Sequence, residues 1–483
     1  MSPAAGAGDR ARARVRDAGG DELLERLDHL DRVRQTGAVR EPRLSAPRPP
    51  TEPSRVDFDV VLAGGGLWLL LAPLLAARGL RVAVLDRSRV GASHREWNAS
   101  GPELDALVRA GLTSREELDR MVIARYRHGV CRFASGGTYP VVGVLDHAVS
   151  AGALLAHARE LAVSRGVALL DGHELTAHAA GPAGVSMYVT SGGGRIEITA
   201  RVLVDARGAA SPYARTDLVC PTVGGVVAGL VEGSAPDEIL PDVGEILATT
   251  EGIDQGRQHV WEAFPGSPGE VTVYLFRYAR VGEEGSLSEL YARFFEMLPR
   301  YKRGAARLVR PTFGYIPGWS RLTPAPSSPD ARVLLVGDAA ARQSPLTFCG
   351  FGATLRSLAL AADAVARAVD GGLSGSGCVV DDAPSHALTG ALARVMASRG
   401  FQGNALNELL DAAFQTLHAM DHDAYARLLR DEIAPREIVT FLRRTAARHP
   451  RVWGTAVRAL GAVNAGRWSA AVARAMLPTW SAV

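Results

Sequence analysis

One glutamate of the sequence stands in surroundings that would change its chemistry. Glu262 lies in the segment VWEAFP, between Trp261 and Phe264, in a stretch whose pattern predicts a β-strand. Burial among aromatic rings would raise the pKa of this carboxyl group and keep it protonated near neutral pH, so that it could act as a general acid. Because side chains alternate along a strand, only one of Trp261 and Glu262 can face a binding site. A solvent-facing carboxylate is the alternative.

A second candidate acid is Glu96 in the segment REWN. Arg95 and Glu96 form either an exposed pair of charges or part of a cofactor site, and both interpretations stay open. No Ser-His-Asp set or metal-ligand spacing stands out, so we predict no metal site. The four cysteines lack any CxxC spacing, which favours a reducing compartment over a disulfide framework.

A glycine turn in the segment VVLAGGGLWLLLAPLLAARGLRVAVLD is typical of dinucleotide binding. It follows a predicted strand and opens an apolar stretch, and a second predicted strand then ends at an acid. Small residues let the backbone approach a pyrophosphate, and the acid can hydrogen-bond to a ribose hydroxyl. The predicted cofactor-binding residues here are Gly64, Gly65, Gly66, Asp86 and Arg87.

The same stretch has two irregularities. Leu69 occupies the position of the third glycine in the dinucleotide fingerprint, so we expect the helix to move outward or to change its first turn. Pro73 is expected beyond that first turn, where it would kink the helix. Residues 60–77 carry no charge, which leaves a membrane span as an alternative; the glycine turn, Pro73 and the short length all count against it.

A second cofactor element follows in the segment VLLVGDAAARQSPLTFCGFG. An aspartate at the end of a buried strand, followed by small residues and a glycine-rich helix start, suits a flavin. In flavoproteins with two dinucleotide motifs, such an aspartate holds the ribityl chain and the backbone after it faces the isoalloxazine ring. We therefore place Gly337 and Asp338 at the ribityl chain, with Gly350, Phe351 and Gly352 near the ring. An ordinary strand and loop of an α/β domain is the alternative.

Four segments give the sequence a family resemblance: HREWNASGPELDALVRAGLTSREELD, VLVDARG, HVWEAFP and GDAAARQSPLTFCGFG, in this order. They strongly resemble the CruA/CruP-type lycopene cyclases, a branch of the flavin-dependent lycopene cyclase family. The resemblance covers roughly residues 57–375. It implies an FAD fold of the glutathione-reductase type with an apolar tunnel for a carotene. It also implies conversion of the linear ends of lycopene to β-ionone rings, a redox-neutral reaction that needs reduced FAD.

The resemblance also suggests roles for particular residues. Glu262 and Glu96 become the candidate catalytic acids, and Arg207 in DARG would order the junction between the sheet and FAD. The candidate substrate contacts are Trp261, Phe264, Pro345 and Phe348. NAD(P)H is an indirect reductant in this interpretation.

Three positions depart from the family pattern. Leu69 replaces the third glycine, Ala341 replaces the glycine usual in GDxxG, and Gly101 stands where a basic residue is common. The first two lie where contacts to FAD are expected. Two other functions therefore stay open. One is an FAD/NAD(P)H-dependent monooxygenase or reductase acting on an apolar substrate. The other is a degenerate flavoprotein that binds a carotenoid or lipid without catalysis.

The chain has 483 residues, which is too long for one simple core and indicates more than one domain. The predicted fold class is α/β. We predict a Rossmann-like FAD-binding domain of the glutathione-reductase type, a substrate domain built on an antiparallel sheet, and a helical C-terminal cap. The predicted ranges are 1–56 for an N-terminal extension with a short amphipathic helix and a Pro-rich linker, 57–215 and 331–383 for the two parts of the FAD-binding domain, 216–330 for the substrate domain, and 384–483 for a basic helical region.

The charge distribution bears on partners. A net charge of +3 does not indicate nucleic-acid binding. Residues 433–483 nevertheless hold eight arginines, one glutamate and three tryptophans. This region is either a helical cap or a basic amphipathic surface for an anionic membrane. With lycopene or a related carotene as substrate and no apolar signal segment, we expect a cytoplasmic protein, with attachment to the inner face of the cytoplasmic membrane left open.

Overall fold

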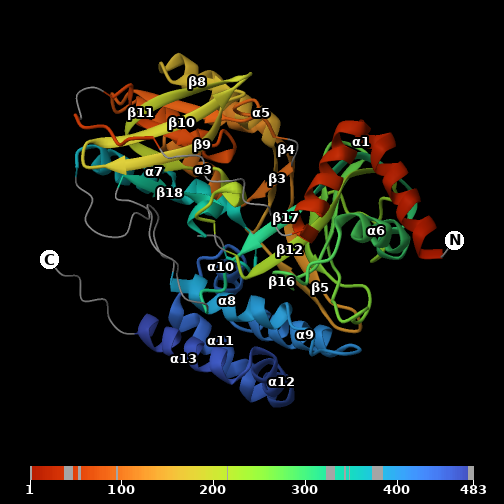
Figure 1. Cartoon of the computed structure of the whole chain (residues 1–483). Helices are drawn as coiled ribbons and strands as arrows, with labels where there is room; N and C mark the ends of the chain where they lie inside the picture. Colours follow the sequence, from red (N-terminus) through yellow and green to blue (C-terminus); the bar gives the residue numbers. More distant parts are fainter. Residues whose placement is uncertain are drawn as a thin grey trace.

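The computed structural model describes residues 3–36, 47–52, 56–93, 96–214, 216–322, 332–341, 344–347, 349–371 and 384–476. Two sheets dominate it, each with helices on at least one face, and a smaller sheet lies between them (Figure 1). The C-terminal helices form a separate layer at the bottom of this view.

The first sheet has seven strands among the described residues, in the order β8-β2-β1-β11-β10-β9, with β18 beside β11. Their bounds are β1 (Phe58–Ala63), β2 (Val82–Asp86), β8 (Ala168–Asp171), β9 (Glu174–Gly181), β10 (Gly184–Ser191), β11 (Gly194–Asp205) and β18 (Val333–Leu335). β8, β2, β1, β11 and β18 are parallel, while β9 and β10 are antiparallel neighbours. As predicted, the chain returns to this sheet after residue 331.

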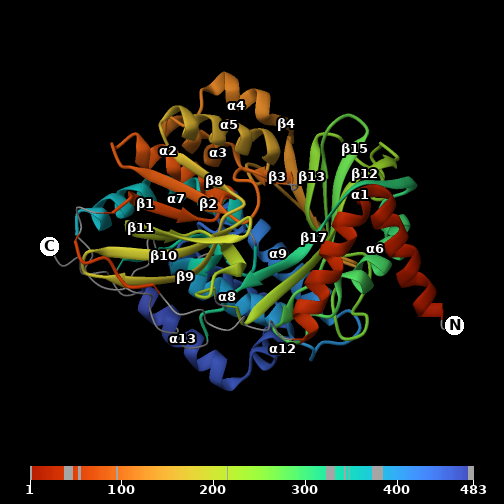
Figure 2. The same ribbon diagram turned by 45° about the horizontal axis from the view of Figure 1, so that its top comes forward.

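Both faces of the first sheet are covered at β1, which explains why its residues 60–63 carry no charge. Along β1, Val60 and Leu62 pack among helices, whereas Val61 and Ala63 pack against the β9–β10 ribbon. The helices are α2 (Leu71–Ala76), α3 (Gly101–Arg109), α4 (Arg115–Met121), α5 (Ala151–Ser164) and α7 (Gly350–Val369), most of them visible together in Figure 2. Residues 60–77 thus form a strand, a turn and short helices, and no described helix has the length and apolar character needed to span a bilayer.

The second sheet has eight strands among the described residues, in the order β16-β12-β15-β14-β13-β5-β6, with β17 beside β12. Their bounds are β5 (His128–Arg132), β6 (Thr138–Val141), β12 (Leu218–Leu230), β13 (Val243–Ala248), β14 (Val260–Pro265), β15 (Glu270–Phe276), β16 (Ala279–Arg280) and β17 (Gly304–Gly318). β14 and β15 form the predicted antiparallel hairpin.

Two strands of the second sheet come from a range predicted for the first domain. β5 and β6 lie within residues 57–215, yet β5 pairs in parallel with β13. A parallel pairing over such a separation leaves no hairpin signal in the sequence, so the predicted boundary missed it. The β10–β11 hairpin, in contrast, belongs to the first sheet. A small sheet of β3 (Glu96–Ala99), β7 (His147–Ser150) and β4 (Val122–Arg125) lies between the two.

The N-terminal extension covers one face of the second sheet. α1 (Pro3–Thr36) packs on α6 (Leu287–Tyr301) and β17, with a break at Gly20, where φ is 76°. The helix is longer than the sequence pattern predicted, but its apolar side chains do pack on the body of the protein. Asp31 of α1 accepts hydrogen bonds from the backbone N–H groups of Leu287 (2.8 Å) and Ser288 (3.1 Å), so it caps α6 from another helix.

The C-terminal helices cover the other face of the second sheet. They are α8 (Pro384–Met396), α9 (Ala405–His418), α10 (His422–Leu429), α11 (Pro435–Arg448), α12 (Pro450–Leu460) and α13 (Ala462–Met476). Their apolar side chains share one core with β5, β6 and β14. The predicted helical cap therefore exists, and it closes the sheet that carries Glu262.

Candidate functional site

Three glycine-containing loops meet where the parallel strands of the first sheet end. Gly64, after β1, has φ 115°, and a Cβ there would lie 2.3 Å from the carbonyl oxygen of Ala206, after β11. Gly208, in the short 3-10 helix η3 (Gly208–Ala210), faces Asp338, whose Oδ2 lies 3.6 Å from the position of a Cβ. The DARG, GDAAA and GGG segments thus form one edge, as expected for a dinucleotide site at the carboxyl ends of strands.

The glycine turn itself is held by Asp86. Its carboxylate accepts hydrogen bonds from the N–H of Gly65 (2.8 Å) and from the N–H and Oγ of Ser88 (2.8 and 2.7 Å). Gly66 is exposed, and a Cβ there would meet no atom within 4 Å. The backbone is therefore open to a ligand at Gly66. Arg87 is exposed beside a shallow depression of about 510 Å³.

Leu69 changes the helix that follows this turn. Residues Leu67–Leu70 form a 3-10 helix, η2, and α2 begins only at Leu71. Leu69 is fully buried, and its Cδ2 lies 3.2 Å from where a Cβ on Gly91 would be. The expected change of the first turn is confirmed. The expected kink at Pro73 is wrong: because α2 starts late, Pro73 lies in its first turn, where no backbone N–H is required.

The second cofactor element keeps its backbone shape despite its altered sequence. Gly337 begins the 3-10 helix η4 (Gly337–Ala340) with φ 58°, and Trp68 Nε1 lies 2.6 Å from the position of a Cβ on it. Ala341 follows with φ 51° and ψ 42°, in the left-handed region that favours glycine. The alanine thus adopts a backbone conformation that glycine would adopt with less strain.

Arg207 orders the junction between the loops, while its predicted contact with FAD stays a prediction. Its guanidinium binds both carboxylate oxygens of the fully buried Asp205, at 3.1 and 2.7 Å, and also donates to the carbonyl oxygen of Leu175. Ser211 Oγ donates to the same carboxylate (2.7 Å). These contacts leave Arg207 a structural role within the described residues.

The REWN and GFG segments also come together. Trp97 of β3 and Phe351 of α7 pack with ring centroids 4.9 Å apart. Gly350 and Gly352 are buried, and a Cβ on Gly352 would collide with the carboxylate of Glu103. Glu96 contributes its backbone to β3, but its side chain and all of Phe348 lie outside the described residues, so their predicted roles stay predictions.

The residues at this edge fit a dinucleotide in two respects. The open backbone at Gly66 and the carboxylates of Asp86 and Asp338 are placed as such a ligand needs them. The helix that should point its N-terminus at the pyrophosphate is replaced by one 3-10 turn and the six residues of α2. These residues could hold FAD, through the backbone turn more than through a helix dipole.

A second site lies between the second sheet and the C-terminal helices. It is a cavity of about 130 Å³. Its lining is almost wholly apolar and comes from the second sheet, from nearby loops and from five C-terminal helices. The lining residues are Leu145, Ile246, Leu247, Glu262, Tyr278, Leu346, Thr347, Cys349, Leu392, Val395, Met396, Leu409, Leu410, Ala413, Phe414, Leu417, Leu428, Leu429, Phe441, Leu442, Thr445, Val452, Trp453 and Ala456. The segment that immediately precedes Gly350, Phe351 and Gly352, the residues predicted to lie near the flavin ring, thus borders the cavity.

Glu262 is the one carboxylate in this lining. Within the described residues it makes no hydrogen bond or ion pair, and burial alone raises its pKa to about 8. The side chain keeps some accessible surface because it faces the cavity. The acid is therefore largely protonated at neutral pH, as predicted.

The other polar side chains of the lining already have partners. The hydroxyl groups of Tyr278, Thr347 and Thr445 donate to Leu346 O, Asp431 Oδ2 and Phe441 O, and Cys349 Sγ donates to Leu429 O. A molecule in the cavity would thus meet hydrocarbon on most sides and one carboxylic acid. Such a lining suits an apolar substrate with a group that accepts a proton.

Strand alternation sends Trp261 to the opposite face. It is fully buried against Tyr301 and Phe294, at centroid distances of 4.5 and 5.6 Å. Trp261 therefore does not line the cavity, and its predicted substrate contact stays a prediction. Phe264 shares the face of Glu262, and Pro345 packs against Gly318, but neither lines the cavity.

Sequence reasoning missed several neighbours of the site. Tyr278 and Thr347 line the cavity. The hydroxyl of Thr347 donates a hydrogen bond of 2.7 Å to Asp431 Oδ2. The backbone of Asp431 is in the left-handed region, with φ 61°. Burial raises the pKa of Asp431 to about 6. The sequence segment SPLTFC indicated a site near Thr347, but no local pattern predicts that Thr347 binds Asp431, which lies among the C-terminal helices.

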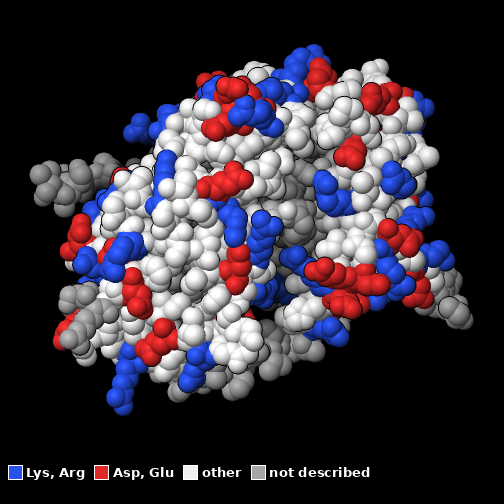
Figure 3. Space-filling model, turned by 90° about the horizontal axis from the view of Figure 1, so that it is seen from above, with Lys and Arg blue, Asp and Glu red and all other residues white. Residues whose placement is uncertain are grey.

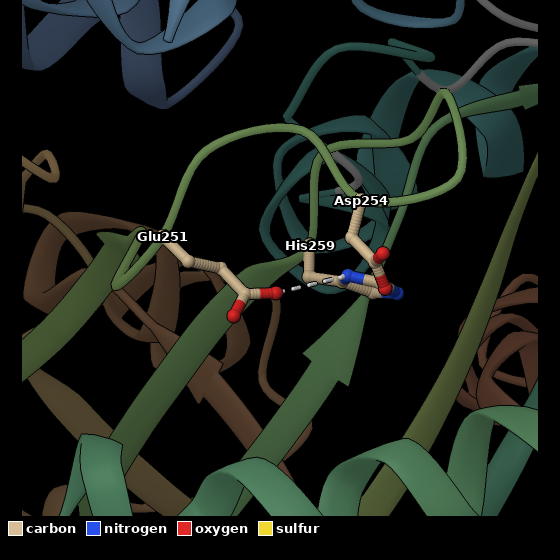
Figure 4. A group of neighbouring side chains, drawn as sticks. All are labelled: Glu251, Asp254 and His259. Carbon is tan, nitrogen blue, oxygen red and sulfur yellow. Dashed lines mark ion pairs between the residues drawn. The ribbon is translucent and has the colours of Figure 1, made fainter. Parts of the chain in front are cut away.

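One group of side chains has the composition of a metal site. Glu251, Asp254 and His259 offer ligand atoms within 4.8 Å of one another, and His259 points towards Glu251 (Figure 4). Arg293 Nη2, however, lies 3.0 Å from both carboxylates. Burial, with Arg277 and Arg293 nearby, lowers the pKa of His259 to about 3. Arg293 already supplies the positive charge, so the group is an ion-pair cluster that fixes the β13–β14 loop to α6.

The face seen from above is hollowed between the part with the first sheet and the part with the second (Figure 3). Lys and Arg side chains stand along this hollow, with acidic groups further out.

No protein-family model matches the sequence, and no curated protein sequence matches it. Solved structures do match the fold. A geranylgeranyl bacteriochlorophyll reductase-like protein from Thermoplasma acidophilum has a TM-score of 0.51 at 14% identity, covering 82% of this chain and 97% of that one. The p-nitrophenol 4-monooxygenase from Pseudomonas putida has a TM-score of 0.55 at 17% identity, covering 80% and 98%.

The halogenase PltM, in a complex with phloroglucinol and FAD, has a TM-score of 0.56 at 15% identity, covering 87% of this chain and 97% of that one. At these identities the likeness concerns the fold. The chain has the Rossmann-type α/β fold of FAD-binding flavoprotein oxidoreductases, with a helical C-terminal part.

Proposed function

We propose that this protein is a flavin-dependent enzyme that protonates an alkene of a large apolar substrate, and that its reaction is the cyclisation of the linear ends of lycopene to β-ionone rings. The observation that carries the proposal is Glu262, a protonated acid that has no partner among the described residues and lies in an apolar cavity. The four segments shared with the CruA/CruP-type lycopene cyclases support the choice of substrate.

The chemistry needs little beyond this acid. The O–H of Glu262 transfers its proton to the terminal alkene, and a neighbouring alkene attacks the resulting tertiary cation to close the ring. The ring cation then gives a proton back to the Glu262 carboxylate, which restores the acid and completes an isomerisation. The apolar lining excludes water, which would otherwise trap the cation as an alcohol. Reduced FAD, when bound, supplies negative charge that stabilises the cation. Asp86, Asp338 and the backbone at Gly66 would hold it.

A second candidate function is a reductase or monooxygenase on the same substrate class. The fold is that of oxidoreductases, and one neighbour's name refers to a geranylgeranyl group. Glu262 could then protonate a carbon that also receives a hydride. A non-catalytic carotenoid- or lipid-binding protein is the third possibility, and the bulky residues Leu67, Trp68 and Leu69 after the glycine turn favour it.

The test begins with the visible spectrum of the purified protein after FAD is added and the excess removed. A flavin band near one equivalent supports the two enzymatic functions, and no retained flavin favours the binding protein. Lycopene is then incubated with the protein and FAD reduced by dithionite. Cyclisation leaves the mass of the product equal to that of lycopene, whereas reduction adds hydrogen and monooxygenation adds oxygen. Consumption of NAD(P)H in proportion to product would contradict the cyclase proposal.

A further inference from the structure

The last three helices carry an unusual excess of positive charge. α11, α12 and α13 hold eight arginines, all of them exposed: Arg436, Arg443, Arg444, Arg448, Arg451, Arg458, Arg467 and Arg474. None of them forms an ion pair with a carboxylate of the described residues. Glu437, the one acid of this segment, is engaged by Arg427 of α10. Uncompensated charge of this density on neighbouring helices calls for an anionic partner.

The inner faces of the same helices belong to the candidate site. α11 contributes Phe441, Leu442 and Thr445 to the cavity lining, and α12 contributes Val452, Trp453 and Ala456. The outer side of α12 exposes Arg451, Val457 and Arg458. α12 is therefore a wall one helix thick, with the apolar cavity on one side and solvent on the other.

Exposed apolar side chains accompany the arginines. Val457 is 41% exposed, Val463 69% and Met476 43%. A nucleic acid would be bound by the charges alone, whereas a lipid surface takes both, with phosphates at the guanidinium groups and apolar side chains between the headgroups. Figure 1 places α12 and α13 at the bottom of the molecule, away from α1.

We propose that α11, α12 and α13 form a docking face for an anionic lipid bilayer, which brings the outer wall of the cavity against the membrane. A hydrocarbon dissolved in the bilayer could then reach Glu262 by displacement of α12 without crossing water. The inference rests on the proposed function only for the nature of that hydrocarbon. Binding to the membrane requires no catalysis.

The experiment measures co-sedimentation with vesicles of phosphatidylcholine alone and of phosphatidylcholine with phosphatidylglycerol. The protein is expected to bind the anionic vesicles and to be released by salt, because each arginine near such a surface contributes about fivefold in affinity. Arg451→Gln with Arg458→Gln should weaken binding about 25-fold. Val457→Ser with Val463→Ser, which leaves the charge unchanged, should also weaken it, which a purely electrostatic attachment to any polyanion would not require.

The matched control is Arg300→Gln with Arg307→Gln, two exposed arginines of α6 and β17 that lie outside the C-terminal helices. It changes the net charge equally and should retain binding. Equal losses for both arginine pairs, no binding at low salt, or tighter binding to duplex DNA than to anionic vesicles would overturn the proposal. Thermal unfolding of each variant confirms that it is folded.

The failure of this proposal is distinct from the failure of the proposed function. Glu262→Gln should bind vesicles like the unchanged protein, whatever its effect on lycopene. If the protein converted detergent-dispersed lycopene but did not bind vesicles, only the proposed docking face would be overturned. If the protein bound vesicles but did not convert lycopene, the proposed docking face would be retained and the proposed cyclase activity would be rejected.

Discussion

The carboxylates at the edge of the first sheet and the one in the apolar cavity have opposite surroundings. Asp86 accepts three hydrogen bonds, and Asp205 is bound by Arg207 and Ser211. Glu262 accepts none from the described residues, and its pKa is raised to about 8. Apolar burial without a partner favours the protonated form of a carboxyl group. The same functional group therefore shapes a loop in one region, and in the other it has the surroundings of the proton donor that we propose.

The largest expected effect comes from removing the acid. Glu262→Gln should reduce conversion of lycopene by at least 10²-fold, as expected for loss of a general acid, while flavin content stays the same. In the unchanged protein, conversion should fall as the pH rises through about 8, because Glu262 then loses its proton. Product formation over a pH series measures both.

Glu270→Gln, in the same β14–β15 hairpin but outside the cavity lining, is the matched control and should keep full activity. If Glu262→Gln retained most of the activity, the acid would have to be sought elsewhere, with Glu96 as the next candidate.

The altered glycine turn gives the next largest effect. Restoring glycine at the third position, Leu69→Gly, removes a fully buried side chain and should destabilise the fold by about 3–5 kcal/mol. The structure thus argues against Leu69 as a defect that glycine would repair. Chemical denaturation measures the loss, and Leu74→Ala, at a partly buried position of the neighbouring helix, should cost clearly less. A gain in flavin content without loss of stability would show that Leu69 does block the site.

Stability should depend on pH through Glu262. Its pKa in the folded protein, about 8, is above the ordinary value of 4.5, so the folded state binds the proton more tightly. The contribution is fully present below about pH 4.5 and declines as the pH rises through 8. Thermal unfolding at several pH values should show the unchanged protein losing stability relative to Glu262→Gln over this window. Parallel pH curves for the two proteins would contradict burial of an unpartnered acid.

The smallest effect is expected at Ala341. Its left-handed backbone carries strain that glycine would relieve, so Ala341→Gly should stabilise the fold by about 1 kcal/mol. The melting temperature should rise by about 2 °C. Ala339→Gly, at a buried position in η4 without positive φ, should instead destabilise it. A decrease with Ala341→Gly would mean that the alanine methyl group has a packing role.

Local patterns predicted much of the fold. The strand, turn and second strand around Gly64 and Asp86, the β14–β15 hairpin and the return of the chain at β18 follow from periodicity and glycine positions. The addition of β5 to β13 could not be predicted, since it depends on pairing between distant segments. The start of α2 at Leu71 could not be predicted either. The four residues before it form a 3-10 helix, and the hydrophobic periodicity of so short a stretch does not distinguish a 3-10 helix from an α-helix.

In the candidate site, too, local features could be predicted from the sequence, whereas contacts between distant segments could not. The character of Glu262 was predictable from its aromatic neighbours and its strand position. Which of Glu262 and Trp261 faces the cavity was not, since α6 and the C-terminal helices both offer an apolar surface to the sheet. Most cavity residues of α8 to α12 carry no chemical signal: they are leucines and valines whose role depends on what they cover.

The cap that Asp31 places on α6 has a consequence during synthesis. Asp31 leaves the ribosome 256 residues before Leu287, the backbone group that it binds. At about 5–20 residues per second, α1 must wait for roughly 13–51 s before its partner helix exists. During that time the apolar side chains of Val15, Leu24 and Leu27 have no surface to cover. We therefore expect the nascent chain to depend on a chaperone that holds its first helix until the second sheet is complete.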